Sequence, residues 1–132
     1  MLTLFPDLLT YSFFGPTIVR LALGGALIAL AHRHLLARER IRDEMRGFGA
    51  LAPAIASGIP ASEALIGTLI TIGLFTQVAA LLSVVIAIKL WAAHRKYPAI
   101  TSPGPLALLC MGAIALSLVV TGPGAFAFDL PL

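Results

Sequence analysis

Four long apolar runs constrain the fold of this chain more than any other feature of its sequence. They cover residues 11–31, 61–75, 77–93 and 106–121. A helix rises about 1.5 Å per residue, so runs of this length extend roughly 22–32 Å, close to the ~30 Å hydrocarbon core of a bilayer. In lipid, a helix satisfies its own backbone hydrogen bonds, whereas an open sheet does not. The sequence therefore predicts an all-α fold, an integral membrane four-helix bundle in which residues 1–132 form one domain.

The composition agrees with this prediction. Hydrophobic residues make up 59% of the chain and charged residues 11%, against about 25% charged in soluble domains. Too few charges are available to coat a soluble bundle, so the lipid bilayer is the expected partner. The net charge of +3 would suggest nucleic acid in a soluble protein. Here the basic residues lie beside apolar runs, so the charge is interpreted as membrane topology, and no nucleic acid is expected.

The connections between the runs differ in character. Only Phe75-Thr76-Gln77 separates the second run from the third, which predicts an antiparallel hairpin. The long connection 32–60 begins with a charged, helix-forming half, interpreted either as an extension of the first helix or as an interfacial helix. Residues 47–60 are rich in Gly, Ala and Pro, and whether they form a re-entrant segment stays open at this point.

The basic residues predict the orientation of the bundle. Seven of the nine lie in the connections 32–60 and 94–105: Arg33, Arg38, Arg40, Arg42, Arg46, Arg95 and Lys96. In a four-helix chain these two connections share one side of the membrane. The excess of Lys and Arg on cytoplasmic loops then places both connections in the cytoplasm and both termini outside a cytoplasmic membrane.

Three charged side chains lie within the apolar runs: Arg20, Glu63 and Lys89. Each costs at least ~2.5–3.5 kcal/mol when isolated in a membrane, so partners are expected. Glu63 precedes Thr76 by thirteen residues and Lys89 follows it by thirteen, which places both at about 19 Å depth in a hairpin, against about 13 Å for Arg20. We therefore predict one buried polar cluster formed by Arg20, Glu63 and Lys89.

Two interpretations of this cluster remain open. In the structural one, the charges neutralise one another and fix helix register, or Lys89 extends to the cytoplasmic interface. In the functional one, two cations against one carboxylate leave a positive charge that holds an anionic substrate or a quinone oxygen. His32, His34 and His94 lie at predicted helix ends, where histidines are usually solvated, and no metal site is predicted. No sequence motif for a catalytic site or a cofactor is present, so catalytic residues stay unknown.

Three segments, taken in order, resemble the DoxX family of small four-helix bacterial membrane proteins. They are Arg20-Leu21-Ala22-Leu23-Gly24, the hairpin SEALIGTLITIGLFTQVAALL over residues 62–82, and the tail TGPGAFAFDLPL over residues 121–132. The positions that match the family pattern are Arg20, Gly24, Glu63, Gly73, Gly122, Gly124 and Asp129. The sequence departs from that pattern in its arginine-rich segment after the first helix and in Phe126-Ala127-Phe128.

The resemblance implies a function that the residues alone do not give. The family takes its name from a subunit of a thiosulfate:quinone oxidoreductase, and other members are linked to redox stress complexes. The chain would then be a subunit or accessory of a quinone-linked membrane complex, with quinone as the ligand and a partner subunit or a second copy beside it. A non-catalytic scaffold and a small transporter or lipid-binding protein are the alternatives, and enzymatic activity is left open.

Overall fold

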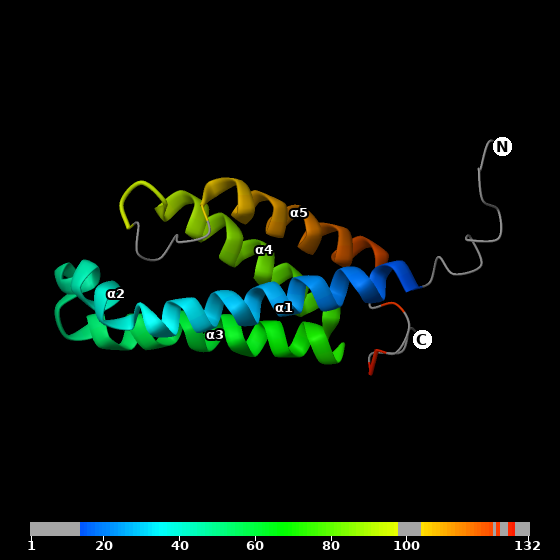
Figure 1. The fold of residues 1–132 in the computed structure, drawn as a ribbon, viewed down its shortest axis with the longest axis horizontal. Coiled ribbons are helices and arrows are strands. Elements are labelled where there is room, and N and C mark those ends of the chain that lie inside the picture. The colour runs from blue at the N-terminus through cyan, green and yellow to red at the C-terminus, as the bar shows by residue number, and fades with distance from the viewer. Residues whose placement is uncertain (1–13, 98–103, 123, 125–126, 129–132) are drawn as a thin grey trace.

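The computed structural model describes residues 14–97, 104–122, 124, 127 and 128, and every regular element within them is helical (Figure 1). In chain order the elements are α1 (Phe14–Leu36), α2 (Arg38–Glu44), the 3-10 helix η2 (Met45–Leu51), α3 (Ala52–Ile72), α4 (Thr76–Ala93) and α5 (Pro105–Thr121). The all-α class is thus confirmed for the described residues, and α1, α3, α4 and α5 are the four main helices.

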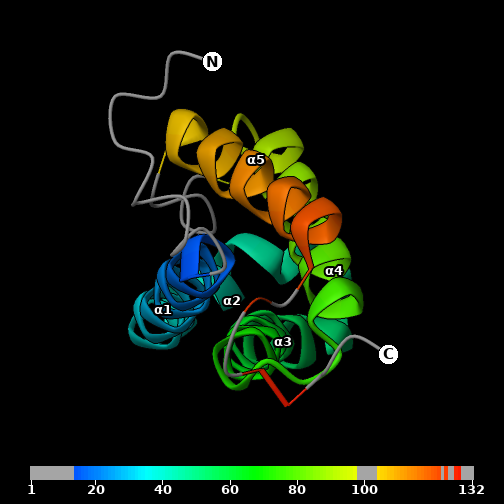
Figure 2. The same cartoon turned by 90° about the vertical axis from the view of Figure 1, so that its right-hand side faces the viewer.

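The four main helices form two antiparallel pairs. α1 packs mainly against α3, and α4 mainly against α5, with smaller contacts between the pairs. Figures 1 and 2 show the pairs side by side, with α2 lying across the end of the bundle where α1 finishes and α3 begins. Two groups of buried apolar side chains fill the interior, one around Leu27 and Ile70 and the other, nearer α2, around Leu30 and Leu90.

Glycine allows the close contact between α1 and α3. A Cβ atom on Gly24 would lie 2.9 Å from the carbonyl oxygen of Gly67, and one on Gly67 would lie 3.0 Å from the carbonyl oxygen of Gly24. Small residues permit such backbone approach between helices in membranes, where dispersion contacts rather than water exclusion hold helices together. This contact fixes the register of α1 against α3, and with it the level of every side chain between them.

The turn between α3 and α4 lies at residues 73–75, two residues earlier than the Phe75-Thr76-Gln77 connection expected from the sequence. Gly73 ends α3 with φ +80°, and the N–H groups of Gly73 and Leu74 both donate to the carbonyl oxygen of Leu69, at 2.9 and 3.0 Å. Phe75 also has a positive φ of 49°. Glycine terminates helices in this left-handed conformation because it carries no Cβ.

The long connection after the first apolar run is mostly helical. α1 continues to Leu36, and α2 then changes direction and is anchored by the buried side chains of Ile41 and Met45. Of residues 47–60, the first five belong to η2 and the rest form the beginning of α3, which includes Pro60. Residues 47–60, whose structure was open from the sequence, therefore comprise the end of η2 and the first part of the long helix α3.

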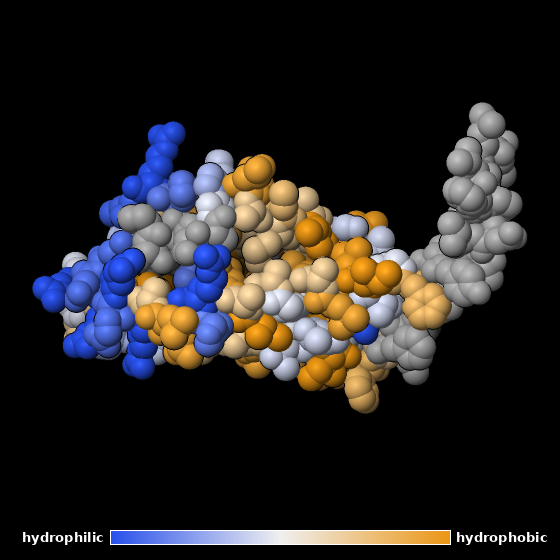
Figure 3. Space-filling view, viewed as in Figure 1, coloured by the Kyte–Doolittle hydropathy of each residue, from blue (hydrophilic) through white to orange (hydrophobic). Residues whose placement is uncertain are grey.

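The surface separates into an apolar body and a charged end. Large apolar side chains such as Ile18, Leu65 and Val120 are exposed along the helices, and Figure 3 shows the hydrophilic residues gathered around α2. Three helices, α1, α3 together with the segment before it, and α4, are long and apolar enough to cross a membrane. α5 is apolar but has only 17 residues. The molecule is thus suited to contact with a lipid bilayer.

Candidate functional site

A buried hydrogen bond joins the end of α1 to the middle of α3. Nδ1 of His34 lies 2.7 Å from Oε2 of Glu63, and neither side chain is more than 1% exposed. The hydrogen bond links two buried polar side chains on different helices, so it fixes the position of the Glu63 carboxyl relative to α1.

Each member of this pair has a second polar atom that is not used. Oε1 of Glu63 and Nε2 of His34 are buried and have no hydrogen-bond partner among the described residues. A buried polar atom without a partner costs about 1–3 kcal/mol relative to a bonded one. Native structures rarely retain such atoms without a reason, and a bound ligand or water is among the usual ones.

Glu63 lines a cavity of about 380 Å³ between α3 and α4. Most of the wall is apolar and includes Ile59, Ile86 and Leu90. The other polar residues of the wall are Ser62, Lys89 and Tyr97. The Ser62 hydroxyl already donates to the carbonyl oxygen of Ile59 at 2.8 Å, which leaves the carboxyl of Glu63 and the ammonium of Lys89 as the charged groups of the cavity.

Of the three residues predicted to form one cluster, the structure brings two together. Glu63 and Lys89 line the same cavity, although they are ten and fourteen residues from the nearer end of the turn at residues 73–75. Lys89 is exposed, and no ion pair joins it to Glu63 or to another described residue. Its charge therefore faces the mouth of the cavity and does not neutralise the carboxylate directly.

Arg20 lies elsewhere, and the predicted three-residue cluster needs correction. The side chain is 3% exposed and approaches Gly73 at the end of α3, where an added Cβ would lie 2.6 Å from Nη1 of Arg20. Fourteen residues separate Arg20 from His34 on α1, which corresponds to about 21 Å. The α1–α3 contact at Gly24 places Arg20 level with the turn, too far away for its side chain to reach Glu63.

His34 is the residue of this candidate site that the sequence does not single out. It was interpreted as a solvated interfacial histidine, yet it is fully buried. The signal was its position on α1, because Leu23, Leu27, Leu30 and His34 follow one another at spacings of four, three and four residues. That spacing defines one face of a helix, so His34 continues the buried stripe.

The remaining motif residues lie near the turn end of the bundle. Gly122 follows the last residue of α5 with φ +77°. Gly124 packs on the start of α1, where an added Cβ would lie 2.8 Å from the backbone nitrogen of Thr17. Asp129 lies outside the described residues. Gly124 thus allows a close backbone contact with α1, whereas Gly122 has a positive φ, which glycine adopts readily.

In the part of the chain that the structure describes, no three His, Cys, Asp or Glu side chains gather as a metal site requires. No protein-family model, no curated protein and no solved structure matches this chain.

Proposed function

We propose that this protein is an integral membrane subunit of the DoxX type in a quinone-linked redox complex, and that it binds the quinone head group in the α3–α4 cavity. The observation that carries the proposal is Glu63, which lines a mostly apolar cavity and whose buried Oε1 has no hydrogen-bond partner among the described residues. The ordered resemblance in sequence supplies the redox context. The chain itself would supply binding and a proton-holding group, and the electron acceptor would belong to the partner subunit.

The cavity suits a quinone head in size and chemistry. Sites for small ligands usually measure about 300–1,000 Å³ and combine apolar walls with a few polar groups, and this cavity holds about 380 Å³. A quinone ring is apolar on its faces and has an oxygen at each of two opposite edges. One oxygen would accept a hydrogen bond from the protonated carboxyl of Glu63, which His34 orients from behind. The other would lie towards Lys89, whose positive charge favours electron density on that oxygen.

The proposed membrane position places this cavity within reach of the quinone pool. α1, α3 and α4 would span the bilayer, α5 would span it with about 26 Å of helix, and the basic α2 end would face the cytoplasm. A ligand dissolved in the hydrocarbon could then enter between α3 and α4 without crossing an aqueous phase.

The proposal is tested by quinone binding to the purified protein. We expect a short-chain ubiquinone to bind in neutral detergent, as measured by isothermal titration calorimetry. Glu63→Leu removes both carboxyl oxygens and should weaken binding by roughly two- to tenfold, the effect of losing one hydrogen bond between neutral groups. Glu39→Leu removes an exposed carboxyl on α2 and should leave binding unchanged. Wild-type affinity in a folded Glu63→Leu variant would contradict the proposal.

A second candidate function, a non-catalytic membrane scaffold, is favoured by one observation. His34 and Glu63 bond to each other and thereby join α1 to α3, as expected of a pair that fixes packing. A scaffold predicts that Glu63→Leu lowers the unfolding temperature while neither quinone nor its analogues bind the wild-type protein. The same calorimetry therefore separates the two functions.

A further inference from the structure

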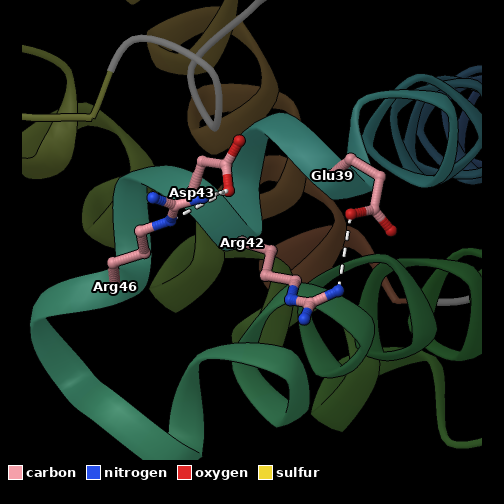
Figure 4. Close-up of polar contacts among 4 residues, drawn as sticks. All are labelled: Glu39, Arg42, Asp43 and Arg46. Carbon is pink, nitrogen blue, oxygen red and sulfur yellow. Dashed lines mark hydrogen bonds and ion pairs between the residues drawn. The ribbon is translucent and has the colours of Figure 1, made fainter.

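The arginines at the α2 end of the molecule fall into two groups. Arg42 donates to Glu39 at 3.5 Å and Arg46 contacts Asp43 at 3.0 Å, as Figure 4 shows. Arg33 and Arg40 are exposed and form no ion pair with a described residue. Carboxylates thus neutralise Arg42 and Arg46, whereas the positive charges of Arg33 and Arg40, where α1 meets α2, can bind an anion.

Arg33 and Arg40 line one concavity of about 390 Å³, together with Leu36, Ala37 and Glu39. Glu39 is the only carboxylate in its wall, and that carboxylate is the one bonded to Arg42. Two guanidinium groups therefore face a shared hollow in which the single negative charge already has a partner. Paired guanidinium groups suit a phosphate, whose oxygens accept several parallel N–H hydrogen bonds.

Apolar surface continues from this concavity along α1. Leu36 is 77% exposed beside the arginines, and further along the same helix Ala29, Ala26 and Gly25 are exposed and small. An added Cβ on Gly25 would meet nothing within 4 Å, so this strip is an open, shallow surface. A phosphate site directly above an apolar strip has the chemistry of a phospholipid, with a charged head and a long hydrocarbon chain.

We propose that an anionic phospholipid of the phosphatidylglycerol class binds at the α1–α2 junction. Its phosphate lies between Arg33 and Arg40, and one acyl chain lies along α1 over Leu36 and the small residues that follow. The proposal rests on the membrane location given above but does not depend on quinone binding, because the concavity and the α3–α4 cavity share no lining residue. Charge complementarity favours the anionic lipid over a zwitterionic one.

The test compares two pairs of exposed basic residues, one that lines the concavity and one that does not. The protein is reconstituted in phosphatidylcholine nanodiscs that contain phosphatidylglycerol as the minor component, and native mass spectrometry counts the lipids retained after release. We expect the wild type to retain phosphatidylglycerol in preference to phosphatidylcholine. The double variant R33Q/R40Q should lose this preference by roughly tenfold, since each arginine near a membrane surface contributes a several-fold attraction to anionic lipid.

The double variant R46Q/R95Q removes the same charge from two exposed side chains that do not line the concavity. It is the matched control, expected to change retention less than about twofold, since exposed charges away from the site contribute little. Far-UV circular dichroism should give equal helicity for both variants, because glutamine is a good helix former at exposed positions.

Equal losses of phosphatidylglycerol preference in the two variants would overturn the proposal, because they would indicate a general attraction of the positive end for anionic lipid and not a site. Equal retention of the two lipids by the wild type, or displacement of the lipid by inorganic phosphate, would also overturn it. Unchanged quinone binding by R33Q/R40Q would show that the two sites are separate.

Discussion

The imidazole of His34 and the carboxyl of Glu63 are both buried, with neither side chain more than 1% exposed. Charge inside a membrane helix bundle is tolerated when a partner shares it, and the 2.7 Å contact provides that partner. The need for a partner was evident from the sequence, since Glu63 lies in an apolar run. The identity of the partner was not, because helix depth was estimated from the ends of apolar runs and not from the α1–α3 contact that fixes register.

The two neighbouring histidines of α1 give a direct test at this scale. His34→Ala leaves the buried Glu63 carboxyl without its hydrogen bond and should lower the free energy of unfolding by about 1–3 kcal/mol. His32 is exposed, and His32→Ala should change it by less than about 0.5 kcal/mol. Thermal unfolding in detergent, followed by far-UV circular dichroism, measures both. Equal effects of the two substitutions would contradict the importance assigned to the pair.

Among the elements, the contact between α1 and α3 determines most of what surrounds the site. The apolar runs predicted the four main helices because lipid-length hydrophobic segments leave the backbone no other conformation. Their ends were harder to predict. α3 begins at Ala52 and not near residue 61, because Gly58 and Pro60 are tolerated within a helix whose neighbours pack around it. The turn came earlier than expected because Gly73, and not Phe75, terminates α3.

Adjacent glycines on α1 test this contact. Gly24→Ala would place a Cβ against the Thr71 hydroxyl and 2.9 Å from the Gly67 carbonyl oxygen, so the helices must move apart at a cost of about 1–3 kcal/mol. Gly25→Ala adds a Cβ to open space and should be neutral or slightly stabilising through helix propensity. Chemical denaturation in detergent compares the two variants. A Gly24→Ala variant as stable as Gly25→Ala would show that the contact is less tight than described.

The two ends of the molecule differ in charge: basic residues gather at the α2 end and not at the opposite end, where α3 turns into α4. This difference predicts how the molecule is oriented in a membrane. The sequence predicted this asymmetry from the positions of seven basic residues, and the structure gathers the described ones at the α2 end (Figure 3). The side of the membrane that this end faces remains a prediction. It follows from the preference of Lys and Arg for the cytoplasmic side.

Cysteine labelling tests the orientation. The native Cys110 is exposed, so Cys110→Ser supplies the background. In that background Phe128→Cys, at a position 79% exposed, should react with a membrane-impermeant maleimide on intact bacterial cells. Arg38→Cys should react only after the cells are permeabilised. The reverse pattern would place the basic end outside and would remove the topological argument for the proposed lipid site.

The division of the bundle into two helix pairs has a mechanical consequence. Most packing lies within the α1–α3 pair and within the α4–α5 pair, so the softest motion of the molecule is a change in the angle between pairs. His34 and Glu63 belong to the same pair and stay in register during such a motion. Lys89 belongs to the other pair, so the motion would widen or narrow the cavity while the carboxyl remains fixed. A ligand bound between α3 and α4 would thus push the two helix pairs apart. The outer surface of α5 would move with its pair, and a neighbouring subunit in contact with α5 would respond to that movement.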